Sequence, residues 1–241
     1  MRIRPIRTSI FKKKEDLSTF IRTHIPKIKE GSVLVVTSKI VALSEGRTRK
    51  RKDLTSKEKI IKEESDFVIP TTHVWLTLRN GILAGSAGID ESNSEDGEFI
   101  LLPKDSYATA KKLRAALMSF YTLSSLGVVI SDSRSTPLRA GAVGVALGYA
   151  GIKGLKDYRG KKDLFGREFK HERVNVADSL ATAAMLSMGE GDEKRPLALI
   201  ENAPIEFIDT ADKNELLIAP HEDLYLPFLS KFPKQLLPKK K

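Results

Sequence analysis

Hydrophobic and polar residues follow one another along the chain in two patterns, which predict two kinds of element. Short continuous apolar runs, bounded by polar residues or glycine, are typical of strands buried in a sheet. We expect such strands in four segments, residues 31–42, 81–90, 126–133 and 196–202. The first of these runs also contains three polar residues, Thr37, Ser38 and Lys39, at the expected exit of the strand.

Longer segments carry apolar residues at the three- and four-residue spacing of an amphipathic helix. This spacing predicts helices at residues 15–25, 56–64, 107–121 and 176–191. Pro26 closes the first helix, and Gly189 and Gly191 lie at the end of the last, as helix stops do. Because strands and helices mix without a regular βαβ repeat, we expect an α+β domain of mixed sheets with packed helices over residues 1–241.

One segment, residues 139–152, is unusually rich in glycine and alanine. Small side chains allow two backbones to approach closely. We therefore expect this segment to pack tightly against another element or against a second subunit.

The composition is that of a globular protein without membrane spans. Hydrophobic residues make up 41% of the 241 positions and charged residues 30%, and the lack of cysteine excludes disulfides and thiolate metal sites. No apolar run approaches the roughly eighteen residues that span a bilayer, and the N-terminal segment lacks the apolar core of a signal peptide. We therefore expect a cytoplasmic protein with no membrane partner.

The formal net charge of +10 indicates an anionic partner. Basic residues concentrate in a loop expected at residues 47–60 and in a C-terminal tail at residues 232–241. Neither run carries the interleaved aromatic side chains on which nucleic-acid bases stack. The first interpretation of both runs is solvated surface. Binding of phosphorylated small molecules is the next, and binding of nucleic acid is the least favoured.

Polar clusters follow several apolar runs, where strand ends can converge on a cleft. They are residues 37–39, 90–94, 131–139 and 189–195. Asp and Ser at such positions also commonly cap the next turn or helix, and for any one cluster alone that interpretation is the more frequent. Four acidic residues lie close together at residues 90–96, and within this acidic stretch Glu91, Glu95 and Asp96 are expected to be solvated turn residues.

Oxygen ligands from different clusters can share a divalent cation. Asp90 and Asp132 lie at the ends of different predicted strands, Ser133 adds a hydroxyl group, and Glu190 adds a further carboxylate. Mg²⁺ and Mn²⁺ prefer such ligands, usually with phosphate completing their coordination. The same clusters contain cations suited to phosphate or carboxylate groups: Lys39, Arg134, Arg139 and Arg195. Together these residues predict metal-assisted phosphoryl chemistry.

Other catalytic signatures are absent from the sequence. It has no GxxxxGK[ST] phosphate loop, no GxGxxG after a strand and no HExxH. Ser38, Ser131 and Ser133 lack the nucleophile elbow of hydrolases. A metal-dependent phosphohydrolase that uses the same carboxylates is a further interpretation, as is a non-catalytic or nucleic-acid-associated protein.

Taken in order, these clusters resemble the coenzyme F-420-0:γ-glutamyl ligase family. The resemblance rests on VLVVTSKIVALSEGR, AGIDESN, LLPKD, VVISDSRSTPLRAGAVGVALGYAGI, DYRGKKDLFGRE and VADSLATAAMLSMGEG, between about Gly31 and Asn202. It covers only the ligase domain, without the flavin-binding domain that some members carry. It implies an intertwined homodimer with a glutamyl-ligase-like α/β fold. It also implies a GTP-dependent ligase that joins L-glutamate to the carboxylate of a deazaflavin precursor through an acyl phosphate.

The resemblance also assigns roles to individual residues. It implies two divalent ions, Mn²⁺ or Mg²⁺, with ligands from Asp90, Asp132, Ser133 and Glu190. Nucleotide contacts would come from Ser38, Lys39, Asn93, Met188, Gly189, Glu190 and Arg195, with a contribution from residues 8–11. Lys39 and Arg139 would stabilise charge on the transferring phosphoryl group.

The sequence departs from the family pattern in three places, one of which is the N-terminal Gly-Ile-Pro pattern, replaced here by RTSIF. Leu43 stands where the family usually has a lysine that contacts nucleotide phosphate. Thr136 stands where it usually has an arginine, for which Arg134 is a nearby substitute. The expected function is therefore a metal- and GTP-dependent acid–amino-acid ligase that acts on small molecules.

Overall fold

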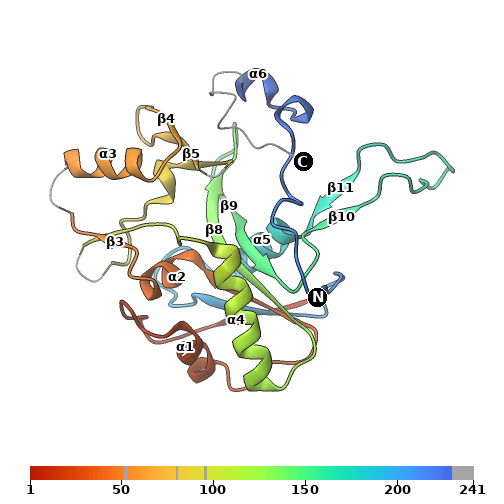
Figure 1. Cartoon of the computed structure of the whole chain (residues 1–241), viewed down its shortest axis with the longest axis horizontal. Helices are drawn as coiled ribbons and strands as arrows, with labels where there is room; N and C mark the ends of the chain where they lie inside the picture. Colours follow the sequence, from red (N-terminus) through yellow and green to blue (C-terminus); the bar gives the residue numbers. More distant parts are fainter. Residues whose placement is uncertain (52–53, 80, 95–96, 230–241) are drawn as a thin grey trace.

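A mixed five-stranded sheet forms the centre of the molecule (Figure 1). The computed structural model describes residues 1–51, 54–79, 81–94 and 97–229. The sheet order is β1 (Arg2–Ile6), β12 (Leu197–Glu201), β2 (Ser32–Thr37), β8 (Leu126–Ser135) and β9 (Ala142–Ala150). β2 and β8 run parallel, whereas the other neighbours are antiparallel. The expected α+β architecture with mixed sheets is confirmed.

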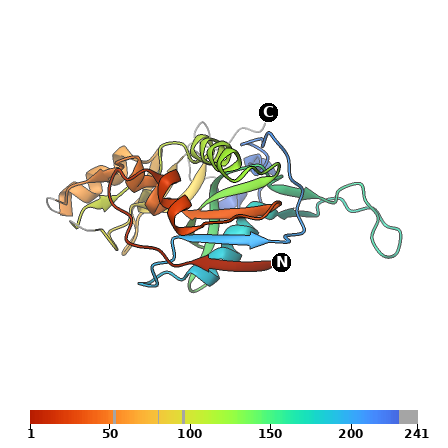
Figure 2. The same cartoon turned by 90° about the horizontal axis from the view of Figure 1, so that it is seen from below.

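Helices cover both faces of this sheet (Figure 2). They are α1 (Leu17–His24) and α4 (Ser106–Tyr121) on one face and α5 (Val176–Met188) on the other. Alternate residues of β2 point to opposite faces, as the pleat requires. Leu34 and Val36 pack with α1 and α4, and Val33 and Val35 pack with α5. The continuous apolar run therefore marks a strand that is buried on both sides.

The helices begin where the sequence supplies capping side chains. Asp16 accepts a hydrogen bond from the Thr19 backbone, and Asp105 accepts one from Ala108, at the first turns of α1 and α4. α5 ends at Gly189, whose positive φ of 82° suits glycine. The predicted helices at 15–25, 107–121 and 176–191 are confirmed, with small differences at their ends.

The strands predicted at residues 31–42 and 81–90 are both shorter than expected. β2 ends at Thr37, and the rest of the first run forms α2 (Ser38–Ser44). The polar residues Thr37, Ser38 and Lys39 mark this boundary, and the apolar residues after them belong to the helix rather than to the strand. In the second run, β6 (Ile82–Gly85) ends at the 3-10 turn η1 (Ser86–Gly88). These shortenings place polar residues at the start of a helix and after a turn.

Two glycines of β9 allow the close packing expected of the small-residue segment. A Cβ atom on Gly144 would lie 2.5 Å from backbone atoms of Ala181 in α5. A Cβ atom on Gly148 would lie 2.5 Å from the backbone of Ser106 in α4. β9 is therefore in direct backbone contact with a helix on each face of the sheet.

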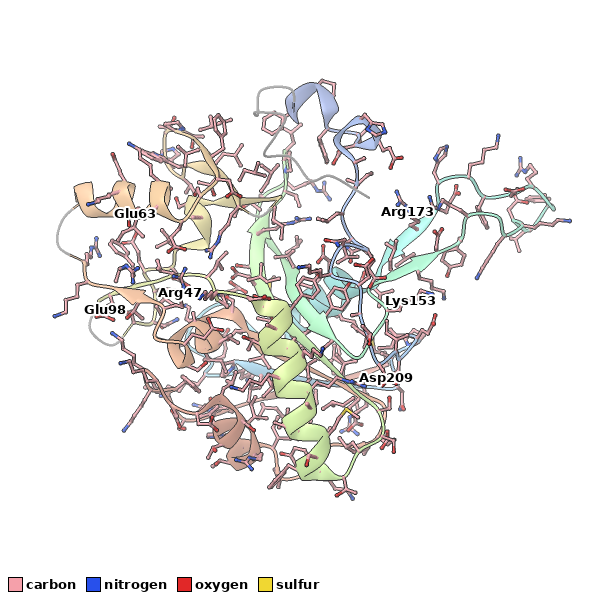
Figure 3. The ribbon with its side chains drawn as sticks, viewed as in Figure 1. Arg47, Glu63, Glu98, Lys153, Arg173 and Asp209 are labelled. Atoms are coloured by element: carbon pink, nitrogen blue, oxygen red, sulfur yellow. The ribbon has the colours of Figure 1, made fainter. Side chains whose placement is uncertain are left out.

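A smaller lobe follows α2. It contains β3 (Thr48–Arg49) paired with β7 (Phe99–Ile100), α3 (Leu54–Glu63), and the sheet of β4 (Phe67–Ile69), β5 (Leu76–Arg79) and β6. Within it, Arg47 donates a hydrogen bond to Glu64 at 2.5 Å, and Arg79 forms an ion pair with Glu64 at 3.2 Å. Figure 3 shows Arg47 at the junction of the lobe with the central sheet. Arg47 is therefore an internal structural residue rather than part of a solvated basic loop, and α3 corresponds to the helix predicted at 56–64.

An extended arm leaves the opposite side of the molecule (Figure 1). It starts and ends with the paired strands β10 (Leu155–Asp157) and β11 (Arg173–Asn175). Leu164 and Phe165, between these strands, are 99% and 81% exposed. After the arm, the chain forms α5 and β12 and then passes through η2 (Pro220–Glu222) and α6 (Leu226–Leu229). The predicted basic tail at 232–241 lies outside the described residues, and no described helix has the length and apolarity needed to span a membrane.

Candidate active site

A cavity of about 490 Å³ opens at the ends of the parallel strands β2 and β8. Because Thr37, the last residue of β2, lies opposite Ser131 within β8, the residues that come next in each segment, Ser38 and Asp132, lie close together. A register shift between Ile130 and Ser131 lies just before Asp132, and such irregularities commonly redirect side chains beside active sites. The local geometry of the two strands thus explains why their polar exits meet.

Nearly all the predicted site residues line this one cavity. The set comprises Ser38, Lys39, Asn93, Asp90, Asp132, Ser133, Met188, Gly189, Glu190 and Arg195, together with residues 8–11. Leu43, at the position where a lysine was expected, lines it as well. The structure therefore brings the separate polar clusters together, while the roles of their residues stay predictions.

Asp132 is held in an environment that disfavours its charge. Burial raises the pKa of the Asp132 carboxyl group to about 7, and the negative charges of Asp90 and Glu190 act in the same direction. Hydrogen bonds from the Ser133 backbone, at 2.9 Å, and from the Ser38 side chain compensate only in part. No salt bridge to Asp132 occurs among residues 1–51, 54–79, 81–94 and 97–229. The carboxyl group thus lacks a compensating cation.

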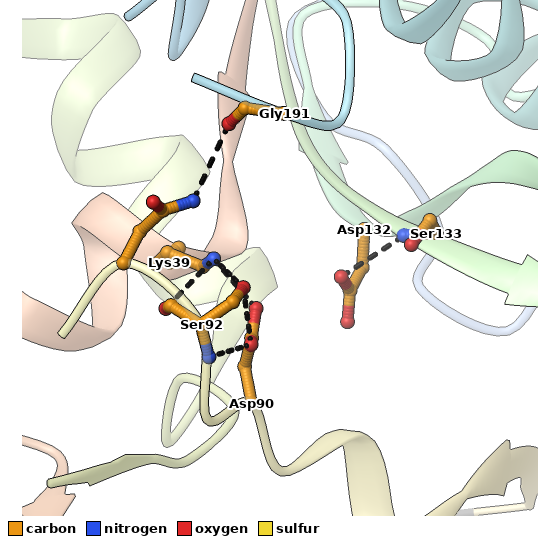
Figure 4. A network of polar contacts seen from close by, with 7 residues as sticks. Lys39, Asp90, Ser92, Asp132, Ser133 and Gly191 are labelled. Carbon is orange, nitrogen blue, oxygen red and sulfur yellow. Dashed lines mark hydrogen bonds and ion pairs between the residues drawn. The ribbon is translucent and has the colours of Figure 1, made fainter. Parts of the chain in front are cut away.

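Asp90, in contrast, is fully paired (Figure 4). The Lys39 ammonium lies 2.6 Å from Asp90 Oδ2 and donates to Ser92 Oγ and to the Ser92 carbonyl at 3.0 and 3.2 Å. The backbone N–H and hydroxyl of Ser92 donate to Asp90 Oδ1 at 2.7 and 2.8 Å. Although burial acts in the opposite direction, the hydrogen bonds from Lys39 and Ser92 hold the pKa of Asp90 below its usual value.

Ser92 was not among the predicted site residues. In an Asx turn, an Asp side chain accepts a hydrogen bond from the backbone N–H two residues later, as Asp90 does from Ser92. The spacing of these two residues was the sequence signal that could have identified Ser92. Glu91 was expected to be solvated, yet it forms ion pairs with Arg51, at 3.4 Å, and with Lys57. The interpretation of Glu91 as a solvated turn residue is therefore wrong, and part of the basic run lies against the acidic stretch.

Two loops meet across the mouth of the cavity. The Asn93 amide donates to the Gly191 carbonyl at 3.4 Å, and the Thr8 backbone donates to the Lys194 carbonyl at 2.9 Å. The Glu193 carboxylate, which the sequence did not single out, accepts from Gly191 N–H at 2.9 Å. These contacts join the loop after α5 both to the N-terminal segment and to the loop that contains Asn93, and all three segments line the cavity.

Arg139 is the predicted residue that the cavity does not include. It is exposed in the turn between β8 and β9, and its backbone N–H donates to the Thr136 carbonyl at 3.3 Å. Arg134, the expected substitute at Thr136, lies 3.9 Å from Asp178 of α5. A role for Arg139 in catalysis stays a prediction.

The predicted metal ligands supply suitable donors without forming a compact cluster. In the part of the chain that the structure describes, no three His, Asp or Glu side chains lie close enough together to hold a metal ion. Nevertheless, Asp90, Asp132, Ser133 and Glu190 offer the hard oxygen ligands that Mg²⁺ and Mn²⁺ prefer. The uncompensated carboxyl group of Asp132 also favours a cation beside it. The donor set therefore fits divalent cations whose remaining ligands are water or phosphate oxygens.

Comparisons with known proteins point to one family. Residues 5–202 match the family model described as F420-0:Gamma-glutamyl ligase. The "Coenzyme F420:L-glutamate ligase" of Methanothermobacter thermautotrophicus is 35% identical over 212 residues, covering 80% of this chain and 83% of the relative. Proteins of the same name are 35% identical in Methanocaldococcus jannaschii, covering 81% and 84% of the two chains, and 32% identical in Methanopyrus kandleri, covering 88% and 91%. The matched region begins earlier than the segment from Gly31 on which the sequence resemblance rested.

Proposed function

The chain belongs to the F420-0:gamma-glutamyl ligase family, and we propose that it joins L-glutamate to a carboxylate acceptor similar to coenzyme F-420-0, using GTP. The observation that carries this proposal is the single cavity that collects Lys39, Asp90, Asp132 and Glu190 at the ends of β2 and β8. Acidic and basic groups in one cleft suit a reaction in which two anions must approach each other.

The proposed reaction has two steps. A carboxylate is a poor acyl donor, so its oxygen first attacks the γ-phosphorus of GTP, which releases GDP and forms an acyl phosphate. The amine of glutamate then attacks the acyl carbon, the amide bond forms, inorganic phosphate leaves and the amine loses a proton. No covalent bond to the protein is needed, so the chain contributes binding, orientation and electrostatic stabilisation.

The cavity residues divide between metal and nucleotide in this proposal. Asp90, Asp132, Ser133 and Glu190 would hold two divalent ions, Mn²⁺ or Mg²⁺, which when bound neutralise phosphate charge. Lys39 would donate to a phosphate oxygen. The other nucleotide contacts would come from Ser38, Asn93, Met188, Gly189, Glu190 and Arg195. Arg139 would need movement of the β8–β9 turn to reach the transferring group.

Phosphate release tests the proposed function. With Mn²⁺ and GTP present, we expect inorganic phosphate to appear only when both L-glutamate and an acceptor carboxylate such as coenzyme F-420-0 are added. Comparing phosphate release with GTP and with ATP shows which nucleotide the protein prefers. Chelating the metal is expected to stop the reaction. Phosphate release that is indifferent to glutamate and to the acceptor would instead identify a phosphohydrolase.

We also propose that the protein is a homodimer in which the arm contacts the second copy. Leu164 and Phe165 are almost fully exposed, and burying them against a partner would remove apolar surface from water. Light scattering is expected to give twice the 26.7 kDa of one chain. The double variant Leu164→Ser with Phe165→Ser is expected to shift this mass toward the monomer, whereas Phe120→Ser on α4 is not. A monomeric wild-type protein would contradict the proposal.

A further inference from the structure

Both carboxylate oxygens of Asp90 are occupied by groups of the protein itself. Lys39 holds Oδ2 at 2.6 Å, and Ser92 donates twice to Oδ1, at 2.7 and 2.8 Å (Figure 4). A carboxylate oxygen offers about two lone pairs, so Oδ1 has no free position for a metal. A cation at Oδ2 would lie against the ammonium group of Lys39 and be repelled by it.

We propose that Lys39 occupies the cation position at Asp90 in the metal-free protein and that Ser92 is the positioning residue that keeps it there. This inference rests on the proposed metal site, because it concerns competition for one of its ligands. The hydroxyl of Ser92 accepts from Lys39 and donates to Asp90, so one side chain fixes both members of the pair. Lys39 then competes with the divalent ion for the carboxylate of Asp90.

The first turn of α2 explains why a lysine reaches this position. Ser38 and Lys39 are consecutive, and they contact Asp132 and Asp90 respectively. Each acid therefore receives a hydrogen bond from the same turn, but only Asp90 receives a positive charge. Since Asp90, Asp132 and Glu190 line one cavity, the ammonium group reduces the repulsion among the three carboxylates when no metal is bound.

If a metal displaced Lys39 from Asp90, the ammonium group would be placed to bind a phosphate oxygen. An ammonium group has three donors, and two of its present contacts are with Ser92 rather than with Asp90. After losing Asp90, Lys39 retains these contacts and has one donor free for a phosphate oxygen. Metal binding and nucleotide binding are then coupled, because a phosphate that accepts from Lys39 removes the competitor from Asp90.

The experiment measures Mn²⁺ affinity of the whole chain without nucleotide, from the electron paramagnetic resonance signal of free Mn²⁺. Lys39→Met is expected to tighten Mn²⁺ binding about tenfold, whereas Lys39→Arg, which keeps the charge, is expected to leave it near the wild-type value. Ser92→Ala is expected to tighten it about threefold, and Ser92→Thr, which keeps the hydroxyl, is expected to restore the wild-type affinity. Lys29→Met, which removes the ion pair with Glu201 before β2, is the control and is expected to change nothing.

GTP provides the second measurement. In the wild type GTP is expected to tighten Mn²⁺ binding by a larger factor than in Lys39→Met, because the variant has no competitor to remove. Mn²⁺ affinity in Lys39→Met that is no tighter than in the wild type would overturn the inference. Asp90→Asn separates this outcome from failure of the proposed site: if it binds Mn²⁺ as tightly as the wild type, the metal assignment itself is wrong. Thermal unfolding of each variant shows whether the fold is intact, and the Ser92 pair carries the test if a Lys39 variant does not fold.

Discussion

Asp132→Asn is expected to lower the rate of amide formation by about a thousandfold while raising the melting temperature of the metal-free protein. Asparagine has nearly the shape of aspartate but lacks the charge that a divalent cation needs. In the absence of metal, the same charge is a cost, because the Asp132 carboxyl group is desolvated and lies near Asp90 and Glu190. Removing it relieves a destabilising interaction.

The two effects of Asp132→Asn are measured separately. Initial rates of phosphate release, with Mn²⁺, GTP, glutamate and acceptor, give the loss of activity. Thermal unfolding in the presence of a chelator gives the change in stability. The melting temperature should rise by a few degrees, since a change of 1 kcal/mol in the free energy of unfolding shifts it by roughly 2–4 °C for a chain of this size. Asp209→Asn is the matched control, because the Asp209 side chain is 95% exposed and its ion pair with Arg114, at 3.2 Å, lies outside the cavity. A rate within tenfold of the wild type would remove Asp132 from the site.

Gly148→Ala and Gly144→Ala are each expected to lower the free energy of unfolding by about 4 kcal/mol or more. The added methyl group would lie 2.5 Å from backbone atoms of α4 or α5, and backbone cannot move aside as a flexible side chain can. Either β9 or a whole helix would have to shift, and both core layers depend on their contact.

Gly85→Ala provides the comparison for this expectation. Its added methyl group would meet only the Val74 Cγ1 atom, at 3.0 Å, which belongs to a side chain. The change in the free energy of unfolding should therefore stay within about 1 kcal/mol. Urea denaturation of the three variants gives the values. Similar stabilities for Gly85→Ala and Gly148→Ala would show that the close contacts of β9 do not limit substitution.

The central elements could be predicted because hydrophobic burial controls them. β8, α4, α5 and β12 each repeat one simple pattern over their length, and the structure confirms them. β1 was not predicted, because its apolar residues alternate with arginines rather than forming the continuous run that marked the other strands, and because Pro5 lies within it. Proline is tolerated there because β1 is an edge strand whose one neighbour in the sheet is β12. Pairing across the sheet, rather than local sequence, determines this strand.

The candidate site could be predicted in part for a related reason. Polar residues at the exits of two buried strands were expected to converge, and the parallel pairing of β2 and β8 brings them together. Arg47 looked like surface because its neighbours are basic, but its partner Glu64 comes from a different part of the chain. Ser92 escaped notice because an exposed serine in a turn is common, and only the three-dimensional contacts with Lys39 and Asp90 distinguish it.

The walls of the cavity have a consequence for synthesis of the chain. The Thr8 backbone bonds to Lys194, and β1 pairs with β12, so the first residues are held by residues near position 200. A ribosome adds residues from the N-terminus, at roughly 5–20 per second. The beginning of the chain must therefore wait for some tens of seconds before its partners emerge. The cavity is completed only after Pro196 has left the ribosome, so a nascent chain cannot bind substrate early.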